Sequence, residues 1–205
     1  MYALNTHCPH KRYLKRGVGT AKDIRIENVV ASATLNVKVP LNKLVAKVAG
    51  TEYEPEQFPG LVYRMKEPKA ASLIFTSGKV VCTGAHSPAL ARKAMGKVIE
   101  AIKSIGVEIK DPPKIRIENI VASARIEGTL KLNEIAFQLP NAEYEPEQFP
   151  GLVYRMEDPN VAFLLFGSGK IVCTGGRNVA DVEKAINKIE RELKRIGALE
   201  RPVKK

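Results

Sequence analysis

Cysteine, histidine and long apolar runs are scarce in this chain. It has three cysteines and three histidines among 205 residues. An odd number of widely spaced cysteines does not make a disulfide framework and is typical of a reducing compartment. No apolar stretch is long enough to cross a bilayer, and no apolar run follows the basic segment Met1–Thr20, as a secretory signal would require. We therefore expect an intracellular protein that has no membrane partner.

Catalytic and metal-binding constellations are also lacking. His7, Cys8 and His10 lie close together, but with no fourth ligand nearby they make a weak zinc signal. The Ser-Gly-Lys sequence at 77–79 lacks the spacing of a phosphate-binding P-loop. No pair of carboxylates stands out on the apolar segments. We predict that the protein is not an enzyme and holds neither a cofactor nor a metal.

The charge is strongly positive. Lys and Arg number 33 against 22 Asp and Glu, a formal net charge of +11. Residues 1–22 contribute +5 and contain no acid, so the remaining chain carries +6. Such a surplus favours polyanions, either nucleic acid or an anionic membrane face. Many soluble proteins are equally basic, so charge alone leaves the partner open.

The chain is one unit written twice. Residues 24–106 align with 115–197 without a gap, and roughly half of the positions are identical. The segment YEPEQFPGLVYRM occurs at 53–65 and again at 144–156. A period of this length indicates a duplicated domain and exceeds that of solenoid repeats, which is about 20–50 residues. The predicted organisation is a basic tail (1–22), a first repeat (23–110), a Pro-Pro linker (111–114), a second repeat (115–199) and a short basic end (200–205).

Each repeat has the pattern of an antiparallel sheet with two helices, an α+β unit. In the first copy we predict a strand at 23–37, a short helix at 41–48, strands at 61–65, 71–75 and 79–83, and a long helix that ends at Gly106. Ser87 and its copy Asn178 are the expected N-caps of the long helices. Two such units can pack about a pseudo-twofold axis and share one sheet.

The predicted strands are apolar on both faces. Alternation places Leu73 and Phe75 on one face and Ile74 on the other; the pair Val81 and Thr83 is likewise opposed to Val80 and Cys82. Helices can cover only one face, so the other is an exposed apolar surface that marks a binding site. Homodimerisation through that face is one reading of it.

Polar residues on the same face favour DNA. Asn28 and Asn119 lie beside Val30 and Val121, a mixture that suits the floor of a minor groove. Basic residues at the predicted strand ends are placed to meet flanking phosphates: Arg64, Lys79, Arg155 and Lys170. Cys82 and Cys173 face the helices and are read as inert core thiols.

These motifs together resemble the conserved core of TATA-box-binding proteins. The resemblance rests on the Ile-Glu-Asn strand, on EYEPEQFPGLVYRM in both repeats, and on LIFTSGKVVCTG and LLFGSGKIVCTG, and it covers residues 23–199. The first repeat keeps a Glu-Pro-Glu loop that eukaryotic relatives tend to have lost, which favours an archaeal type. The implied localisation is the cytoplasm of an archaeal cell, in association with the nucleoid, or the nucleus of a eukaryote.

The resemblance implies a saddle in which one curved antiparallel sheet turns its concave face to DNA and the helices lie on the convex face. It implies a general transcription initiation factor that binds the TATA element in the minor groove and bends it. The expected DNA-binding residues of the first repeat are Asn28, Val30, Phe58, Arg64, Leu73, Phe75, Ser77, Lys79, Val81 and Thr83. Those of the second repeat are Asn119, Val121, Phe149, Arg155, Leu164, Phe166, Ser168, Lys170, Val172 and Thr174. By their match to the family motif, the four phenylalanines are the side chains that the resemblance implies wedge into the base steps at the ends of the site, Phe58 with Phe75 and Phe149 with Phe166. The family has a basic residue just after the Thr-Gly turn, and this position holds His86 in the first repeat and Arg177 in the second. The difference implies that phosphate contacts are uneven between the two halves.

Acidic loops in a basic protein point to a protein partner. The loops that precede Phe58 and Phe149 are rich in Glu, and carboxylates are poor neighbours for phosphate. The resemblance implies that the second loop, through Glu145, Glu147 and Gln148, receives transcription factor B, and RNA polymerase indirectly.

Two alternatives stay open at this point. A fold of this type also occurs as an accessory domain in some DNA glycosylases, although no catalytic domain is expected after residue 199. The other alternative is a homodimer of the free protein that uses the apolar face without sequence-specific DNA binding.

Overall fold

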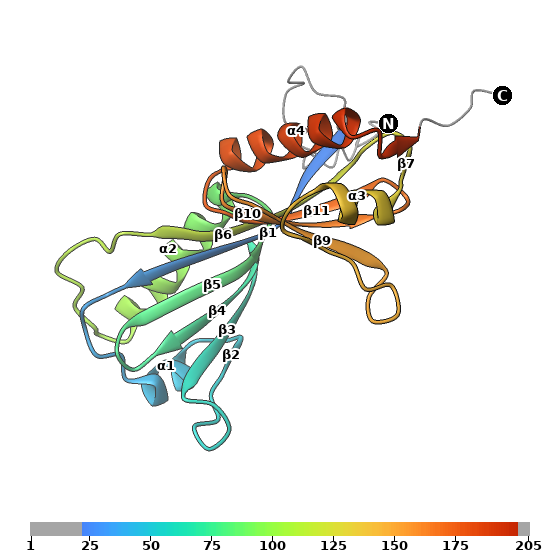
Figure 1. Cartoon of the computed structure of the whole chain (residues 1–205). Coiled ribbons are helices and arrows are strands. Elements are labelled where there is room, and N and C mark those ends of the chain that lie inside the picture. The colour runs from blue at the N-terminus through green and yellow to red at the C-terminus, as the bar shows by residue number, and fades with distance from the viewer. Residues whose placement is uncertain (1–21, 201–205) are drawn as a thin grey trace, which may run out of the picture.

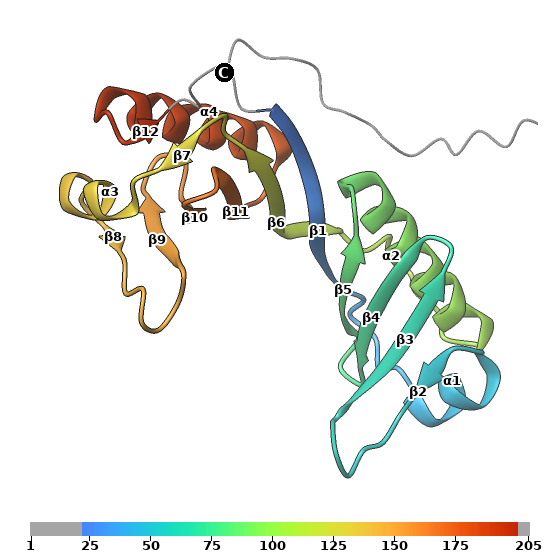
Figure 2. The ribbon, with the colours of Figure 1, turned by 90° about the vertical axis from the view of Figure 1, so that its right-hand side faces the viewer.

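One long antiparallel sheet forms the body of the molecule. The computed structural model describes residues 22–200. Ten strands pair in the order β2-β3-β4-β5-β1-β6-β11-β10-β9-β8, and the sheet curves into a saddle (Figures 1 and 2). The strands of the first half are β1 (Lys22–Thr34), β2 (Thr51–Glu52), β3 (Gly60–Lys66), β4 (Lys69–Phe75) and β5 (Lys79–Ala85). Those of the second half are β6 (Arg116–Arg125), β8 (Ala142–Glu143), β9 (Gly151–Met156), β10 (Val161–Phe166) and β11 (Lys170–Gly176).

The two repeats join through their first strands. β1 and β6 pair antiparallel at the centre of the sheet, with Asn28 opposite Val121 and Val30 opposite Asn119. The register shifts at three places in this ladder, and two of these shifts make Glu27 of β1 and Glu118 of β6 each an extra, bulged residue. The predicted pseudo-twofold arrangement with a shared sheet is therefore confirmed.

Within residues 22–200, four helices cover the outer face of the sheet. They are α1 (Leu41–Lys47), α2 (Pro88–Ser104), α3 (Leu132–Gln138) and α4 (Val179–Arg195). The long helices α2 and α4 bury the predicted apolar stripes, for example Met95, Val98 and Ile102 on α2. The buried strand residues, such as Ile74 and Val80, point to the side of the sheet that the helices cover and pack against the helices. This single layer of core between sheet and helices leaves the concave face of the sheet uncovered. None of the helices in residues 22–200 is long and apolar enough to span a bilayer.

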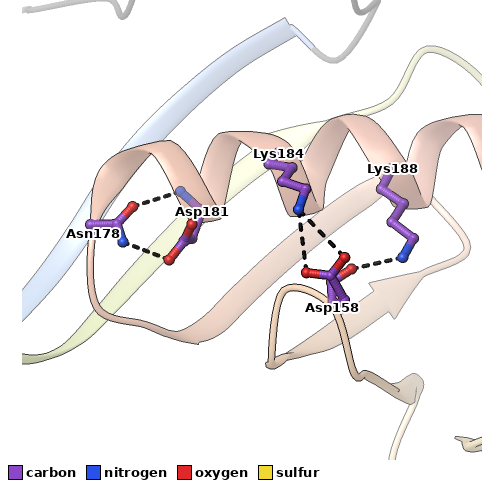
Figure 3. A network of polar contacts seen from close by, with 5 residues as sticks. All are labelled: Asp158, Asn178, Asp181, Lys184 and Lys188. Carbon is purple, nitrogen blue, oxygen red and sulfur yellow. Dashed lines mark hydrogen bonds and ion pairs between the residues drawn. The ribbon is translucent and has the colours of Figure 1, made fainter.

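Side chains cap both long helices as expected. Ser87 Oγ accepts from Leu90 N at 3.1 Å at the start of α2. At the start of α4, Asn178 accepts from Asp181 N at 2.8 Å and donates to the Asp181 carboxylate (Figure 3). Each cap satisfies helix N–H groups that have no partner within the helix.

Several boundaries differ from the sequence prediction. The first strand ends at Thr34 and not at 37, because Asn36 adopts a left-handed backbone with φ of 54° and turns the chain. Helix α1 ends at Lys47, one residue early. Of the two arginines predicted to lie at strand ends, Arg155 is the second-last residue of β9, and Arg64 lies two residues before the end of β3.

Three short strand pairings were not predicted. β2 and β8 extend the two ends of the long sheet, and a separate two-stranded sheet joins β7 (Thr129–Leu130) to β12 (Leu199–Glu200). Two-residue strands carry too little alternation to be recognised in a sequence. The proposed division of the chain into tail, repeats and linker stays a prediction.

Candidate nucleic-acid interface

Asparagines and threonines form matched polar pairs near the centre of the concave face. Asn28 Oδ1 accepts from the backbone N–H of Gly84 at 2.7 Å, which settles the orientation of the amide. Asn28 Nδ2 then donates to Thr83 Oγ1 at 3.0 Å. The second repeat repeats the arrangement, with Asn119 bonded to Gly175 N at 2.7 Å and to Thr174 at 3.1 Å.

This bonding pattern leaves hydrogen-bond donors free. An amide nitrogen has two N–H donors, and Asn28 Nδ2 spends one of them on Thr83. The Thr83 hydroxyl accepts that bond and also lies 3.2 Å from Asn28 Oδ1, to which it can donate its own proton. Each half of the sheet centre therefore offers one free amide donor toward a ligand on the concave side.

Rows of half-buried apolar side chains run across the sheet on either side of this centre. Leu73 stands opposite Val81 on one side and Val62 on the other. The copies Leu164, Val172 and Val153 make the same row in the second repeat. The row residues and the central pair Val30 and Val121 are all partly exposed, whereas their strand neighbours are buried, apart from the half-buried Tyr63 and Tyr154. The predicted split between the two faces of the strands is confirmed.

A phenylalanine pair stands at each end of the concave face. Phe58 and Phe75 meet edge to face, with ring centroids 5.9 Å apart and planes at 64°. Phe149 and Phe166 match them at 6.0 Å and 67°. Phe58 and Phe149 are each 40% exposed although the ring is large and apolar. Exposed rings held by aromatic contact are suited to insert into a partner.

Glycines make room for the rings. A methyl group on Gly60 would lie 2.6 Å from a ring carbon of Phe58 and 3.0 Å from one of Phe75. At Gly151 the corresponding distances to Phe149 and Phe166 are 2.7 and 3.0 Å. Because real Cβ atoms do not approach other atoms this closely, both ring pairs depend on a glycine at the start of the adjacent strand.

Cationic side chains lie on the same face, outside the polar centre. Arg64 is opposite Ala71, which is opposite Thr83, so one row leads from the guanidinium to the polar pair. Arg64 Nε lies 3.5 Å from Glu52 Oε1, with both side chains about two-thirds exposed. Exposed pairs of this kind contribute little stability, so the guanidinium can be given up to another anion.

The remaining predicted rim residues lie where the hairpins turn. Lys79 and Lys170 begin β5 and β11, and Ser77 and Ser168 precede them in the turns. All four are exposed.

The two acidic loops have the same local structure. In the second loop, the backbone N–H groups of Gln148 and Phe149 both donate to Glu145 O at 3.0 Å, and the Gln148 amide donates to the Glu145 carboxylate. The Glu147 side chain is exposed and forms no hydrogen bond or ion pair within residues 22–200. The first loop matches through Glu54 and Gln57. Each tight loop therefore holds its phenylalanine and shows its carboxylates outward.

The structure adds residues that the sequence analysis missed. Val62 and Val153 belong to the apolar rows, and alternation from buried Leu61 and Leu152 could have found them. Ser32 donates to Glu118, and Ser123 donates to Glu27. Both glutamates reach the concave face because they are bulged residues, and nothing in the sequence marks a bulge. Arg177, which the sequence analysis placed at a basic family position, lines the same pocket as Arg155 and Thr174.

No group of metal-ligating side chains occurs in residues 22–200. The candidate ligands His7, Cys8 and His10 lie outside the described residues. Burial raises the pKa of Cys173 to about 12 and raises that of Cys82, which faces the core beside Ser72. Both thiols stay protonated at neutral pH, which agrees with their reading as core residues.

Comparisons with known proteins identify the family to which this chain is similar. The family model described as transcription factor TFIID, or TATA-binding protein, matches twice, at residues 23–105 and 114–196. A TATA-box-binding protein of Archaeoglobus fulgidus is 51% identical over 178 residues, which cover 86% of this chain and 97% of that protein. TATA-box-binding protein B of Halobacterium salinarum is 50% identical and spans 88% of this chain and 98% of its own length. The solved structure of Methanococcus jannaschii TBP superposes with a TM-score of 0.78 at 46% identity, covering 84% of this chain and 99% of that one. The chain belongs to the TATA-box-binding protein family.

Proposed function

We propose that this protein binds A·T-rich promoter DNA in the minor groove, bends it by inserting its phenylalanine pairs, and recruits transcription factor B and, through it, RNA polymerase. The single observation that carries the proposal is the concave face itself. It combines free central donors, half-buried apolar rows and one exposed phenylalanine pair at each end.

The central donors support a preference for A·T pairs. In the minor groove an A·T pair offers only acceptors, whereas a G·C pair adds the guanine amino donor. The free donors of the Asn28–Thr83 pair and of its copy would meet acceptors at A·T steps and would oppose an amino group at G·C steps. The apolar rows, which lack partners for an amino group, act in the same direction.

The phenylalanine pairs support bending. Minor-groove wedging by apolar side chains is an established property of TATA-box-binding proteins, at a cost of about a few kcal/mol per unstacked step. Here the wedges lie at the two ends of a curved sheet, so two kinks would turn the duplex toward the saddle and let it contact the apolar rows. Pyrimidine–purine steps such as TA unstack most easily, which adds to the sequence preference.

The second acidic loop supports a basic partner. Its exposed carboxylates, Glu145 and Glu147, lie next to a wedge and would repel phosphate, so they are better placed for a protein than for DNA. We assign this loop to transcription factor B. Glu147→Arg should abolish the ternary complex with transcription factor B on TATA DNA, and Glu56→Arg in the first loop is the matched control. Equal loss with both variants would contradict the assignment.

DNA bending is tested by titrating the protein into a TATA duplex that carries a dye at each end, with a G·C-rich duplex as control. We expect tight binding and increased energy transfer for the TATA duplex only. Phe149→Ala and Phe166→Ala should lower the energy transfer. Equal binding to both duplexes without energy transfer would reduce the protein to a general polyanion binder.

A further inference from the structure

One cation at the end of a central strand has no copy in the other repeat. It is Arg125, the last residue of β6, which stands directly opposite Lys170, the first residue of β11. The corresponding residue of the first repeat is Thr34, the last residue of β1, which stands opposite Lys79 at the start of β5. The second repeat therefore pairs two cations at a position where the first repeat has only one.

The backbone that holds these two pairs is the same in both repeats. The residue after Arg125 donates its backbone N–H to Gly169 O at 2.9 Å, and the residue after Thr34 donates to Gly78 O at the same distance. Both glycines have a positive φ, 80° and 82°, so the turns before the two lysines share one conformation. The difference between the halves at this position is thus a difference of side chain on a common frame.

Arg125 faces the concave side of the sheet. Ala122 and Ala124 before it on β6 are buried, whereas Ser123 between them is partly exposed and bonds to a glutamate on the concave face. Alternation therefore places Arg125 on the same face as Ser123, and its side chain is exposed. Lys170 is also exposed, and directly opposite residues of two paired strands share a face. Both cations therefore point to the concave side, at the ends of their strands.

No carboxylate in residues 22–200 neutralises this pair, since neither Arg125 nor Lys170 forms an ion pair there. Glu27 on the adjacent strand accepts a hydrogen bond from Ser123 instead. Like charges directly opposite each other in a sheet destabilise it. The free protein therefore carries a repulsion that an anion bound between the two side chains would remove.

The spacing and chemistry of the pair suit a phosphate group. The Cβ atoms of directly opposite residues are about 4.5–5.5 Å apart, so the guanidinium and the ammonium can reach the same anion. The guanidinium of Arg125 can bind two phosphate oxygens with its planar fork, while the ammonium of Lys170 acts as a point charge on a third. In the first repeat, Thr34 offers only a neutral hydroxyl beside Lys79.

We propose that Arg125 and Lys170 together hold one phosphate group of the DNA backbone, and that the first repeat lacks an equally strong contact. The proposal rests on the proposed function, because the DNA must lie on the concave face. A phosphate contact carries no sequence information. The pair therefore raises affinity and its salt dependence without choosing between the two orientations on the duplex.

The test measures the affinity of the full chain for a dye-labelled TATA duplex by anisotropy at several salt concentrations. Arg125→Thr gives the second half the side chain of the first. It should make the slope of log affinity against log salt shallower by about 1 and weaken binding about five- to tenfold at about 0.1 M salt. Thr34→Arg builds a second cation into the first half, so it should steepen the slope and raise the affinity by similar amounts.

Lys93→Thr is the matched control, because it removes an exposed cation from the outer helix α2 and changes the net charge equally. It should leave the slope within about 0.3 of the unmodified protein and the affinity within about twofold, since salt screens charges that are far from the DNA. Thermal unfolding without DNA checks the fold of each variant. Arg125→Thr should not lower the Tm, because it removes a contact between like charges.

Three results would overturn the proposal. A slope in Arg125→Thr that matches the slope in Lys93→Thr would mean that Arg125 contributes only to the total charge. A loss of affinity that does not vary with salt would assign Arg125 to base edges or to packing. No gain with Thr34→Arg would show that a cation opposite the lysine does not create a phosphate contact. Failure of the proposed function is seen separately, as equal binding of the unmodified protein to TATA and G·C-rich duplexes.

Discussion

A single methyl group at Gly151 is predicted to separate the stability of the fold from the proposed wedging of DNA. In Gly151→Ala the added carbon would lie 2.7 Å from a ring carbon of Phe149 and 3.0 Å from one of Phe166. Gly151 does not adopt a left-handed backbone, so alanine fits the strand itself. In the free protein the Phe149 ring is 40% exposed and can swing outward. We therefore expect the free energy of unfolding to change by less than about 1 kcal/mol.

In the proposed complex, bound DNA would remove that freedom. A ring held between base pairs cannot swing away, so the overpacking cost of about 1–3 kcal/mol appears only in the complex. We expect TATA affinity to fall by about 5- to 150-fold, with reduced end-to-end energy transfer. Thermal unfolding and the two-dye duplex titration measure the two quantities.

The matched control is Gly96→Ala on α2, where nothing lies within 4 Å of the added carbon. That variant should gain about 0.5–1 kcal/mol of stability and bind DNA unchanged. An unaltered bend in Gly151→Ala, or a loss of stability above about 2 kcal/mol, would refute the proposed role of the glycine.

Three further predictions follow from the same geometry. Asn119→Asp keeps the acceptor for Gly175 N but replaces the free amide donor with a negative charge. TATA affinity measured by anisotropy should therefore fall more than tenfold, while the free energy of unfolding changes by about 1 kcal/mol. Equal binding by the variant would rule out a donor role for Asn119. Glu27→Gln keeps an acceptor for Ser123 and removes a carboxylate from the concave face, so TATA affinity should rise about two- to fivefold at low salt and less at high salt. An effect independent of salt would contradict this. In a Cys8→Ser background, Cys82 and Cys173 should resist alkylation until the protein unfolds, and rapid labelling of the native protein would show that the core is open. Because burial raises the pKa of Cys173 to about 12, the free energy of unfolding should decline as pH rises from about 9 toward 12.

Alternation and duplication make most of this fold predictable. The alternation of Ile74 and Val80 with Leu73 and Val81 is enough to separate the core face of the sheet from the concave face. A strand has a side-chain period of two, so a few residues suffice to assign its faces. The repeat then transfers each assignment to the second half, and the caps at Ser87 and Asn178 place both long helices.

The sequence analysis misses residues where the side-chain period of two along a strand is interrupted. One extra residue in β1 and one in β6 bring Glu27 and Glu118 to the concave face, where they accept from Ser123 and Ser32. A bulge depends on the register between two strands about 90 residues apart, and local sequence carries no record of that register. The bond from Gly84 N to Asn28 also joins segments 56 residues apart. Contacts of this kind depend on the tertiary fold, whereas the residues that make them are recognisable as candidates from their types and positions.

The near-identity of the two concave halves has a consequence for orientation on DNA. The phenylalanine pairs differ by only 0.1 Å in centroid separation and 3° in plane angle, and the central Asn–Gly bonds are both 2.7 Å. A nearly symmetric face meeting a nearly symmetric A·T-rich site discriminates weakly between two opposite orientations, because each contact has an equivalent in the reversed complex. The strong asymmetry of the chain lies instead in its helices, with a net charge of +5 on α1 and α2 against zero on α3 and α4. Orientation is therefore best explained by partners that bind outside the concave face, which predicts that the free protein binds TATA DNA in both orientations and that added partners select one.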